Sequence, residues 1–328
     1  MTHRAPECIA ALNRTLFLLA LTVTTGLAAA GADERPAQTE PVCPEPTFGD
    51  VAYGPHERNR LDFWQAAWAE PAPLVVHIHG GGFWEGDKSS IRGRRGARVR
   101  RCVDNGVALA SINYRFLPAA ALIDILRDTA RALQFLRSKA GEWHIDKERV
   151  AAFGDSAGAG SSLWLGFHDD MADPDNADPV LRESTRLRAV GALDPQATYD
   201  FPQWPAILKV TPALWAVAAP VIAPSFYRIG PLGLWSEEAK ALRHDLDMLS
   251  MFDPADPPLY LRSKRPKTPP ANWDHLLHHP GHAIALKEKA DAVGIPAVLI
   301  DRDTPPEADL EVLTFLFEKL GVAEPPRG

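Results

Sequence analysis

The serine of the pentapeptide Gly154-Asp155-Ser156-Ala157-Gly158 is the residue of this chain best suited to covalent chemistry. The pattern G-x-S-x-G is typical of a nucleophile elbow, a strained turn between a strand and a helix that exposes a serine hydroxyl. The flanking segments agree, because 150–153 is a short apolar run and 159–167 is rich in small and apolar residues. We therefore expect Ser156 to be a nucleophile.

Three glycines, Gly80 to Gly82, directly follow the apolar stretch 74–79. Glycines after a buried strand leave backbone N–H groups unobstructed, and such groups can stabilise the negative charge of a tetrahedral intermediate. The run is not a phosphate loop, because no Gly-Lys-Ser/Thr follows and the G-x-G-x-x-G spacing is absent. An oxyanion hole is the chemistry that these glycines predict.

These motifs together resemble the α/β-hydrolase fold, and most closely the hormone-sensitive-lipase-like esterases and the bacterial feruloyl and acetyl-xylan esterases. The resemblance is carried by His79-Gly80-Gly81-Gly82-Phe83, Ile112-Asn113-Tyr114-Arg115, Asp128 and the serine pentapeptide. It implies a carboxylic-ester hydrolase that forms an acyl-enzyme on Ser156.

The same resemblance assigns roles to further residues. It implies an oxyanion hole made by the backbone amides of Gly81, Gly82 and Ala157. It also implies that His79 and Asp128 support the glycine loop and the elbow and are not catalysts.

The catalytic acid is harder to place. In this fold the chain order is Ser, then Asp or Glu, then His. The acid is expected after the strand at 258–262, but the Gly-Asp-x-Asp run of the family is missing there, and a basic, Pro-rich loop at 263–273 takes its place. Asp274, which follows that loop, is the best candidate for the acid.

The general base is not at its expected position. It should follow the strand at 297–300, but the loop at 301–306 contains no histidine. In one interpretation a histidine from an earlier loop substitutes in space, held by Asp274, Asp301 or Asp303; we favour His278 and His279 from a group of four that also contains His275 and His282. In the other interpretation that cluster caps a surface helix, and the protein is a degenerate hydrolase with a binding or scaffold role.

The same histidines raise the question of a metal. Spacings of i, i+4 join His275 to His279 and His278 to His282, as in a chelating helix. Pro280 argues against one continuous helix there. We expect no metal and no cofactor.

Strand-like and helix-like segments alternate along the chain. Strands are expected at 60–64, 74–79, 107–114, 149–153, 187–193, 257–264 and 296–302, and helices at 92–104, 119–139, 157–168, 281–293 and 307–320. This order predicts an α/β fold with a mostly parallel central sheet covered by helices on both faces. Residues 200–250 break the alternation with aromatic and proline residues and predict a small helical lid.

The N-terminus predicts export. Positive charge precedes the apolar stretch 16–30 and small residues follow it, as in a signal peptide. We expect a signal peptide at 1–32, a Pro-rich leader at 33–49, a hydrolase domain at 50–322, and a periplasmic or secreted protein without stable membrane insertion after cleavage; an uncleaved anchor is the alternative.

The charge balance limits the partners. The net charge of −7 disfavours nucleic acid, and a small-molecule or polysaccharide-linked ester is the expected substrate. Six arginines nevertheless lie within 92–101. They form either a solvated cationic helix or a contact surface for an acidic partner.

Overall fold

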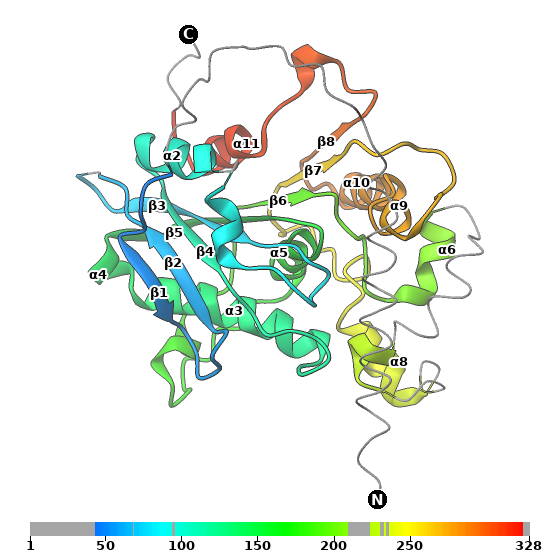
Figure 1. The fold of residues 1–328 in the computed structure, drawn as a ribbon, viewed down its shortest axis with the longest axis horizontal. Coiled ribbons are helices and arrows are strands. Elements are labelled where there is room, and N and C mark those ends of the chain that lie inside the picture. The colour runs from blue at the N-terminus through cyan, green and yellow to red at the C-terminus, as the bar shows by residue number, and fades with distance from the viewer. Residues whose placement is uncertain are drawn as a thin grey trace, which may run out of the picture.

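The computed structural model describes residues 43–67, 69–93, 96–208, 224–229, 233 and 236–323. These residues form one eight-stranded sheet with the order β1-β2-β4-β3-β5-β6-β7-β8 (Figure 1). The strands are β1 Phe48–Ala52, β2 Arg60–Trp64, β3 Ala72–Ile78, β4 Ala108–Ile112, β5 Ile145–Asp155, β6 Ala189–Leu193, β7 Leu259–Ser263 and β8 Ala297–Asp301. Only the β1–β2 and β2–β4 pairs are antiparallel, so the carboxyl ends of β3 to β8 point to one edge.

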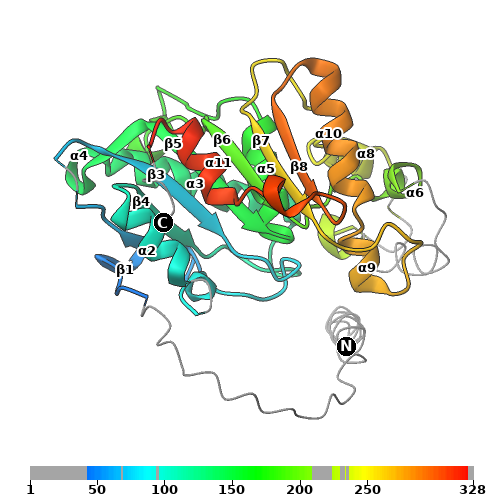
Figure 2. The ribbon, with the colours of Figure 1, turned by 90° about the horizontal axis from the view of Figure 1, so that it is seen from above.

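Helices cover both faces of the sheet, and each face has its own apolar cluster (Figure 2). Leu126 of α3, Leu163 of α5 and Leu286 of α10 belong to one cluster. Val99 of α2 and Leu316 of α11 belong to the other. The helices are α2 Gly96–Asp104, α3 Leu122–Ser138, α4 Ala140–Trp143, α5 Ala157–Phe167, α6 Trp204–Ile207, α8 Glu237–His244, α9 Trp273–Leu277, α10 Gly281–Val293 and α11 Val312–Lys319.

The predicted α/β architecture is confirmed. Each predicted strand and helix has a counterpart, and the ends differ by a few residues in most cases. The predicted helix at 92–104 corresponds to α2, which is described from Gly96, and a 3-10 turn, η2 (Lys88–Ile91), comes before it. The edge strand β1, which begins at the end of the predicted leader, and the short helix α9 were not expected.

The described part of the predicted lid contains short helices. It contains the 3-10 turn η4 (Phe201–Gln203) followed by α6, and later α8. Figures 1 and 2 show α6 and α8 on the same side of the molecule as α9 and α10. Residues 209–223 lie outside the described residues, as does the predicted signal peptide. None of the helices in the described part of the chain has the length and apolar character that crossing a bilayer requires.

Candidate active site

Ser156 sits on a strained turn between β5, which ends at Asp155, and α5, which begins at Ala157. Its φ of 53° and ψ of −116° place a non-glycine residue in a conformation that needs support from its surroundings. Its N–H donates to the carbonyl of Leu193 at 2.9 Å, and its carbonyl accepts from Gly160 N at 3.0 Å. The hydroxyl is thereby held at the carboxyl edge of the sheet.

The two glycines of the pentapeptide are required by close packing against the end of β3. A Cβ on Gly154 would lie 2.4 Å from the carbonyl oxygen of Ile78, and a Cβ on Gly158 would lie 2.0 Å from it. No side chain fits at such distances. The elbow and the end of β3 can therefore touch only because both positions are glycine.

The glycine loop lies beside the elbow. A Cβ on Gly80 would be 2.8 Å from the carbonyl oxygen of Asp155. Gly81 has φ +113°, and its carbonyl accepts from Trp84 N at 3.0 Å and Glu85 N at 3.2 Å in a tight turn. A left-handed residue inside this turn is a position that glycine fills without strain.

His79 lies under the glycine loop and does not reach Ser156. Its ring stacks on Tyr114, with centroids 4.2 Å apart, and its Nδ1 bonds the carbonyl of Gly80 at 2.7 Å. Burial lowers the pKa of His79 to about 4, so the ring is neutral at physiological pH and Nδ1 is assigned the proton. Tyr114 OH donates to the His79 carbonyl at 2.7 Å. These contacts agree with a supporting role.

Asp128 also has a supporting role, but it acts farther from Ser156. Its Oδ2 accepts from Arg115 N at 3.0 Å and from Arg115 Nε at 2.8 Å, and its Oδ1 accepts from Arg115 Nη2 at 2.9 Å. The carboxylate thus ties the chain after β4 to helix α3.

His278 approaches Ser156 from α9. The distance from His278 Nε2 to Ser156 Oγ is 2.9 Å. The other ring nitrogen, Nδ1, lies 3.0 Å from Asp274 Oδ1. A serine, a histidine and a carboxylate in hydrogen-bonded series are the arrangement that activates a hydroxyl as a nucleophile.

Helix α9 fixes the acid and the base together. Asn272 caps its N-terminus, with its side chain accepting from His275 N at 2.8 Å. His278 follows the helix and donates its backbone N–H to the Asp274 carbonyl at 3.1 Å. Residues at i and i+4 lie on one helix face, so the two side chains meet. Pro280 then separates α9 from α10, as its sequence position predicts.

Asp274 is an ionised acid in this setting. The hydrogen bond with His278 lowers the pKa of Asp274, and Arg265 adds to that shift through an ion pair of 3.0 Å to Asp274 Oδ2. Both side chains of this pair are about half exposed, 45% for Arg265 and 47% for Asp274, so solvent screens the interaction. Sequence analysis did not single out Arg265; its place in the basic loop before Asp274 was the available signal.

The other candidate histidines do not contact Ser156 in this arrangement. His275 Nε2 bonds the Pro266 carbonyl at 2.8 Å. His279 Nδ1 accepts from Gly281 N at 3.0 Å. His282 Nδ1 accepts from Ala197 N at 3.3 Å. Their rings therefore hold the loops around α9 in place.

The two aspartates considered as alternative partners of the base are held elsewhere. Lys267 Nζ lies 2.8 Å from Asp301 Oδ2 and 2.7 Å from Asp303 Oδ2. Within the described ranges, no group of three or more His, Cys, Asp or Glu residues is arranged to hold a metal ion.

Two cavities meet at Ser156. The larger, of 360 Å³, borders Gly80, Gly81, Gly82, Trp273 and His278, among others. The smaller, of 30 Å³, has mainly aromatic and apolar walls: Phe83, Tyr199, Phe201, Trp204, Phe226, Trp273 and Leu277. Gly82 and Ala157 border it as well, so all three predicted oxyanion residues lie beside the serine in one cavity or the other. Phe201, Trp204 and Phe226 of this wall belong to the predicted lid.

Parts of this chain are similar to known esterases. Residues 61–207 match the BD-FAE protein family. A probable carboxylic ester hydrolase of Mycobacterium tuberculosis, LipM, is 32% identical over 157 residues, which are 47% of this chain and 35% of LipM. A probable isoprenylcysteine alpha-carbonyl methylesterase of Oryza sativa is 28% identical over 142 residues, which are 42% of this chain and 32% of that protein. The chain thus spans about a third of the length of these curated relatives.

Among solved structures, a truncated form of a carbohydrate esterase from gut microbiota is similar, with a TM-score of 0.63 and 16% identity over 84% of this chain and 96% of that chain. This likeness shows the fold. The predicted α/β-hydrolase fold is therefore confirmed, and the predicted resemblance to the hormone-sensitive-lipase-like and feruloyl or acetyl-xylan esterases is confirmed over residues 61–207.

Proposed function

We propose that this protein hydrolyses carboxylic esters through an acyl-enzyme on Ser156. The observation that carries the proposal is the 2.9 Å contact between Ser156 Oγ and His278 Nε2, with Asp274 behind the ring. His278 takes the hydroxyl proton as Ser156 attacks the ester carbonyl, and then gives it to the departing alcohol. A water molecule, deprotonated by the same ring, hydrolyses the acyl-enzyme and releases the acid.

The negative charge of the tetrahedral intermediate falls between the glycine loop and the start of α5. The first N–H groups of a helix have no partner within the helix, so Ala157 N is available there. Gly81 and Gly82 supply the opposing amides beside the same serine. Preorganised backbone donors of this kind are usually the largest single contribution to such catalysis.

The small cavity favours a short acyl group. Its 30 Å³ is less than a tenth of the 360 Å³ of the neighbouring cavity, and aromatic rings form most of its wall, so it suits a short acyl group such as acetyl. The 360 Å³ cavity is left for the alcohol, which makes an acetylated sugar or polysaccharide the proposed substrate class. The likeness to a carbohydrate esterase supports this choice. Export, proposed from the N-terminal sequence, would bring the protein to such polymers.

The test is hydrolysis of 4-nitrophenyl acetate by the wild type and by Ser156→Ala, with fluorophosphonate labelling of both. We expect turnover and labelling in the wild type and neither in the variant. Well-folded wild-type protein that neither turns over the ester nor takes the label would reject the proposal in favour of a binding or scaffold role.

A further inference from the structure

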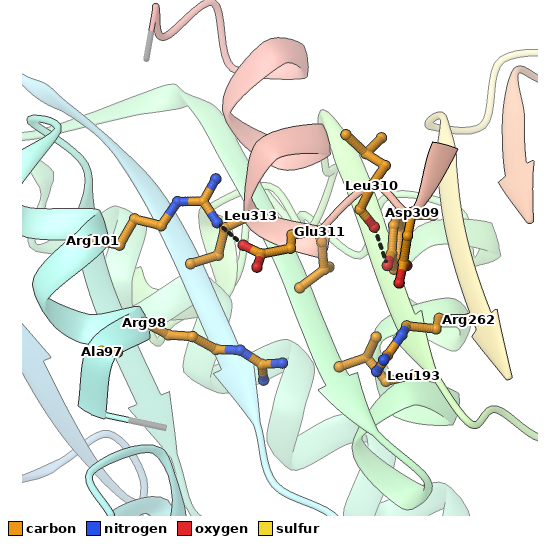
Figure 3. Close-up of a pocket in the computed structure, with 11 residues that line it drawn as sticks. Ala97, Arg98, Arg101, Leu193, Arg262, Asp309, Leu310, Glu311 and Leu313 are labelled. Carbon is orange, nitrogen blue, oxygen red and sulfur yellow. Dashed lines mark hydrogen bonds and ion pairs between the residues drawn. The ribbon is translucent and has the colours of Figure 1, made fainter. Parts of the chain in front are cut away.

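A further cavity, of 470 Å³, which we call the arginine cavity, lies between α2, the carboxyl ends of β6 and β7, and the segment 309–313 (Figure 3). We infer that it is a binding site for a small organic carboxylate. None of the residues that line it also lines a cavity at Ser156. The inference therefore goes beyond the proposed esterase function and does not depend on it.

The side chains that border this cavity carry more positive than negative charge. Three guanidinium groups border the cavity, from Arg98, Arg101 and Arg262, against the carboxylates of Asp309 and Glu311. Both carboxylates are already engaged. Glu311 pairs with Arg101, and Asp309 pairs with Lys264 outside the cavity.

The guanidinium groups of Arg98 and Arg262 point toward one another across the cavity (Figure 3). Arg98 reaches in from α2, with its Cζ 5.6 Å from the centre of the Phe153 ring. Arg262 reaches in from β7, and within the described residues its side chain forms no hydrogen bond or ion pair. Two like charges facing one another are stabilised by an anion placed between them. A carboxylate fits the planar fork of donors that each guanidinium presents.

The rest of the lining is apolar and selects the body of the ligand. Leu193, Val312 and Leu313 contribute side chains. Tyr260 is only 1% exposed, and its OH donates to the Leu310 carbonyl at 2.7 Å. The cavity is therefore bordered by the aromatic ring of Tyr260 and not by its hydroxyl. A carboxylate carried on an apolar or aromatic ring satisfies both parts of this site. An inorganic anion would leave the apolar wall uncovered.

The site lies directly behind the elbow. Leu193 lines the cavity, and its carbonyl accepts the Ser156 N–H at 2.9 Å. Asp155 and Leu193 are paired neighbours on β5 and β6. One strand pair thus separates the arginine cavity from the serine.

The test uses benzoate and its neutral isostere benzamide as probes, with affinities from ligand-observed NMR titration. The wild type should bind benzoate and discriminate against benzamide at least tenfold. Arg262→Gln and, separately, Arg98→Gln should each weaken benzoate binding at least tenfold, because a hydrogen bond to a charged group is lost. The matched control is Arg302→Gln, which removes an exposed arginine from the loop after β8 and should bind benzoate as the wild type does.

Two results would overturn the inference. One is equal affinity for benzoate and benzamide, which would mean an apolar cavity without anion selectivity. The other is benzoate binding that is unchanged in both cavity variants, which would place the ligand elsewhere. Thermal melting of each variant checks its folding. The two arginines lie on different elements, so if one variant does not fold, the other variant still tests the inference.

Discussion

Asp274 and His278 are joined twice across one helical turn, by a backbone hydrogen bond of 3.1 Å and by a side-chain contact of 3.0 Å. In the usual order of this fold the acid and the histidine come from separate loops. Here one short helix positions both, so their mutual geometry is set locally. Only the docking of α9, through the buried Trp273 and Leu276, then has to bring the pair to Ser156.

The first prediction separates the two histidines that follow each other at the end of α9. His278→Ala should lower kcat by several powers of ten, because Ser156 loses the group that takes its proton. His279→Ala should stay within about tenfold of the wild type, since His279 Nδ1 contacts Gly281 N. Steady-state kinetics with 4-nitrophenyl acetate measures both. Near-normal turnover in His278→Ala would contradict the assignment of the base.

The second prediction concerns Arg265 as a positioning residue. Arg265→Gln removes the cation that, with His278, holds the pKa of Asp274 below its ordinary value. The pKa of Asp274 should then rise, and the acid limb of kcat/KM should move to higher pH, although the displacement is small because solvent screens the pair.

The pH profile distinguishes this effect from a purely structural one. The control is Lys267→Gln, which removes a cation of the same loop that pairs with Asp301 and Asp303. Its acid limb should stay in place. An equal shift in both variants would show that the general charge of the loop, not the contact with Asp274, sets the profile.

The elbow and glycine loop were predictable from the sequence because local backbone constraints specify them. Gly154 and Gly158 are demanded by contact with the Ile78 carbonyl, and a strand and a helix flank the serine in chain order. The turn at the serine is constrained over a few residues, and its glycines are required by contact with β3, the neighbour of β5 in the sheet. Such backbone requirements leave a recognisable glycine motif in the sequence.

The base could not be assigned in the same way, because four histidines lie within eight residues. Which of them faces Ser156 depends on where α9 ends and how it docks, and both are tertiary facts. The spacing of Asp274 and His278, four residues apart after the helix cap Asn272, was the signal that would have favoured His278. Arg262 escaped notice for a related reason: its meeting with Arg98 depends on α2 crossing the face of the sheet.

The third prediction tests the short acyl cavity. Phe226 borders this cavity, and its ring meets Phe83 and Phe201 edge-on at centroid distances of 6.2 Å and 5.0 Å. Phe226→Ala should enlarge the cavity and raise the ratio of kcat/KM for 4-nitrophenyl butyrate over acetate by about thirtyfold or more, since butyrate has two methylenes more than acetate and each methylene accommodated contributes about 1–3 kcal/mol.

The same substitution at Phe135, which packs edge-on against Trp143 away from the serine, provides the control. Phe135→Ala should leave the chain-length ratio unchanged, although both variants lose stability. If the ratio did not move in Phe226→Ala, this ring would not limit the acyl group.

The fourth prediction concerns stability and pH through His79. Its pKa is about 4 in the folded protein, against 6.5 for an ordinary histidine. Between these values the unfolded chain binds a proton that the native state excludes, so the free energy of unfolding falls as pH drops from about 6.5 to about 4. At 1.36 kcal/mol per unit, His79 contributes up to about 3 kcal/mol to that loss.

His79→Asn keeps a donor for the Gly80 carbonyl and removes the titration. Urea unfolding at a series of pH values should show a flatter acid decline for this variant, even if the lost stacking on Tyr114 lowers its stability at neutral pH. His144→Asn, which replaces a histidine at a left-handed position that asparagine tolerates, is the matched control for the loss of a histidine. Buried His282, with a pKa of about 3, remains in every variant, so only the difference in slope reports on His79. Parallel declines in His79→Asn and the wild type would mean that the ring under the glycine loop gains a proton as readily in the native state as in the unfolded one.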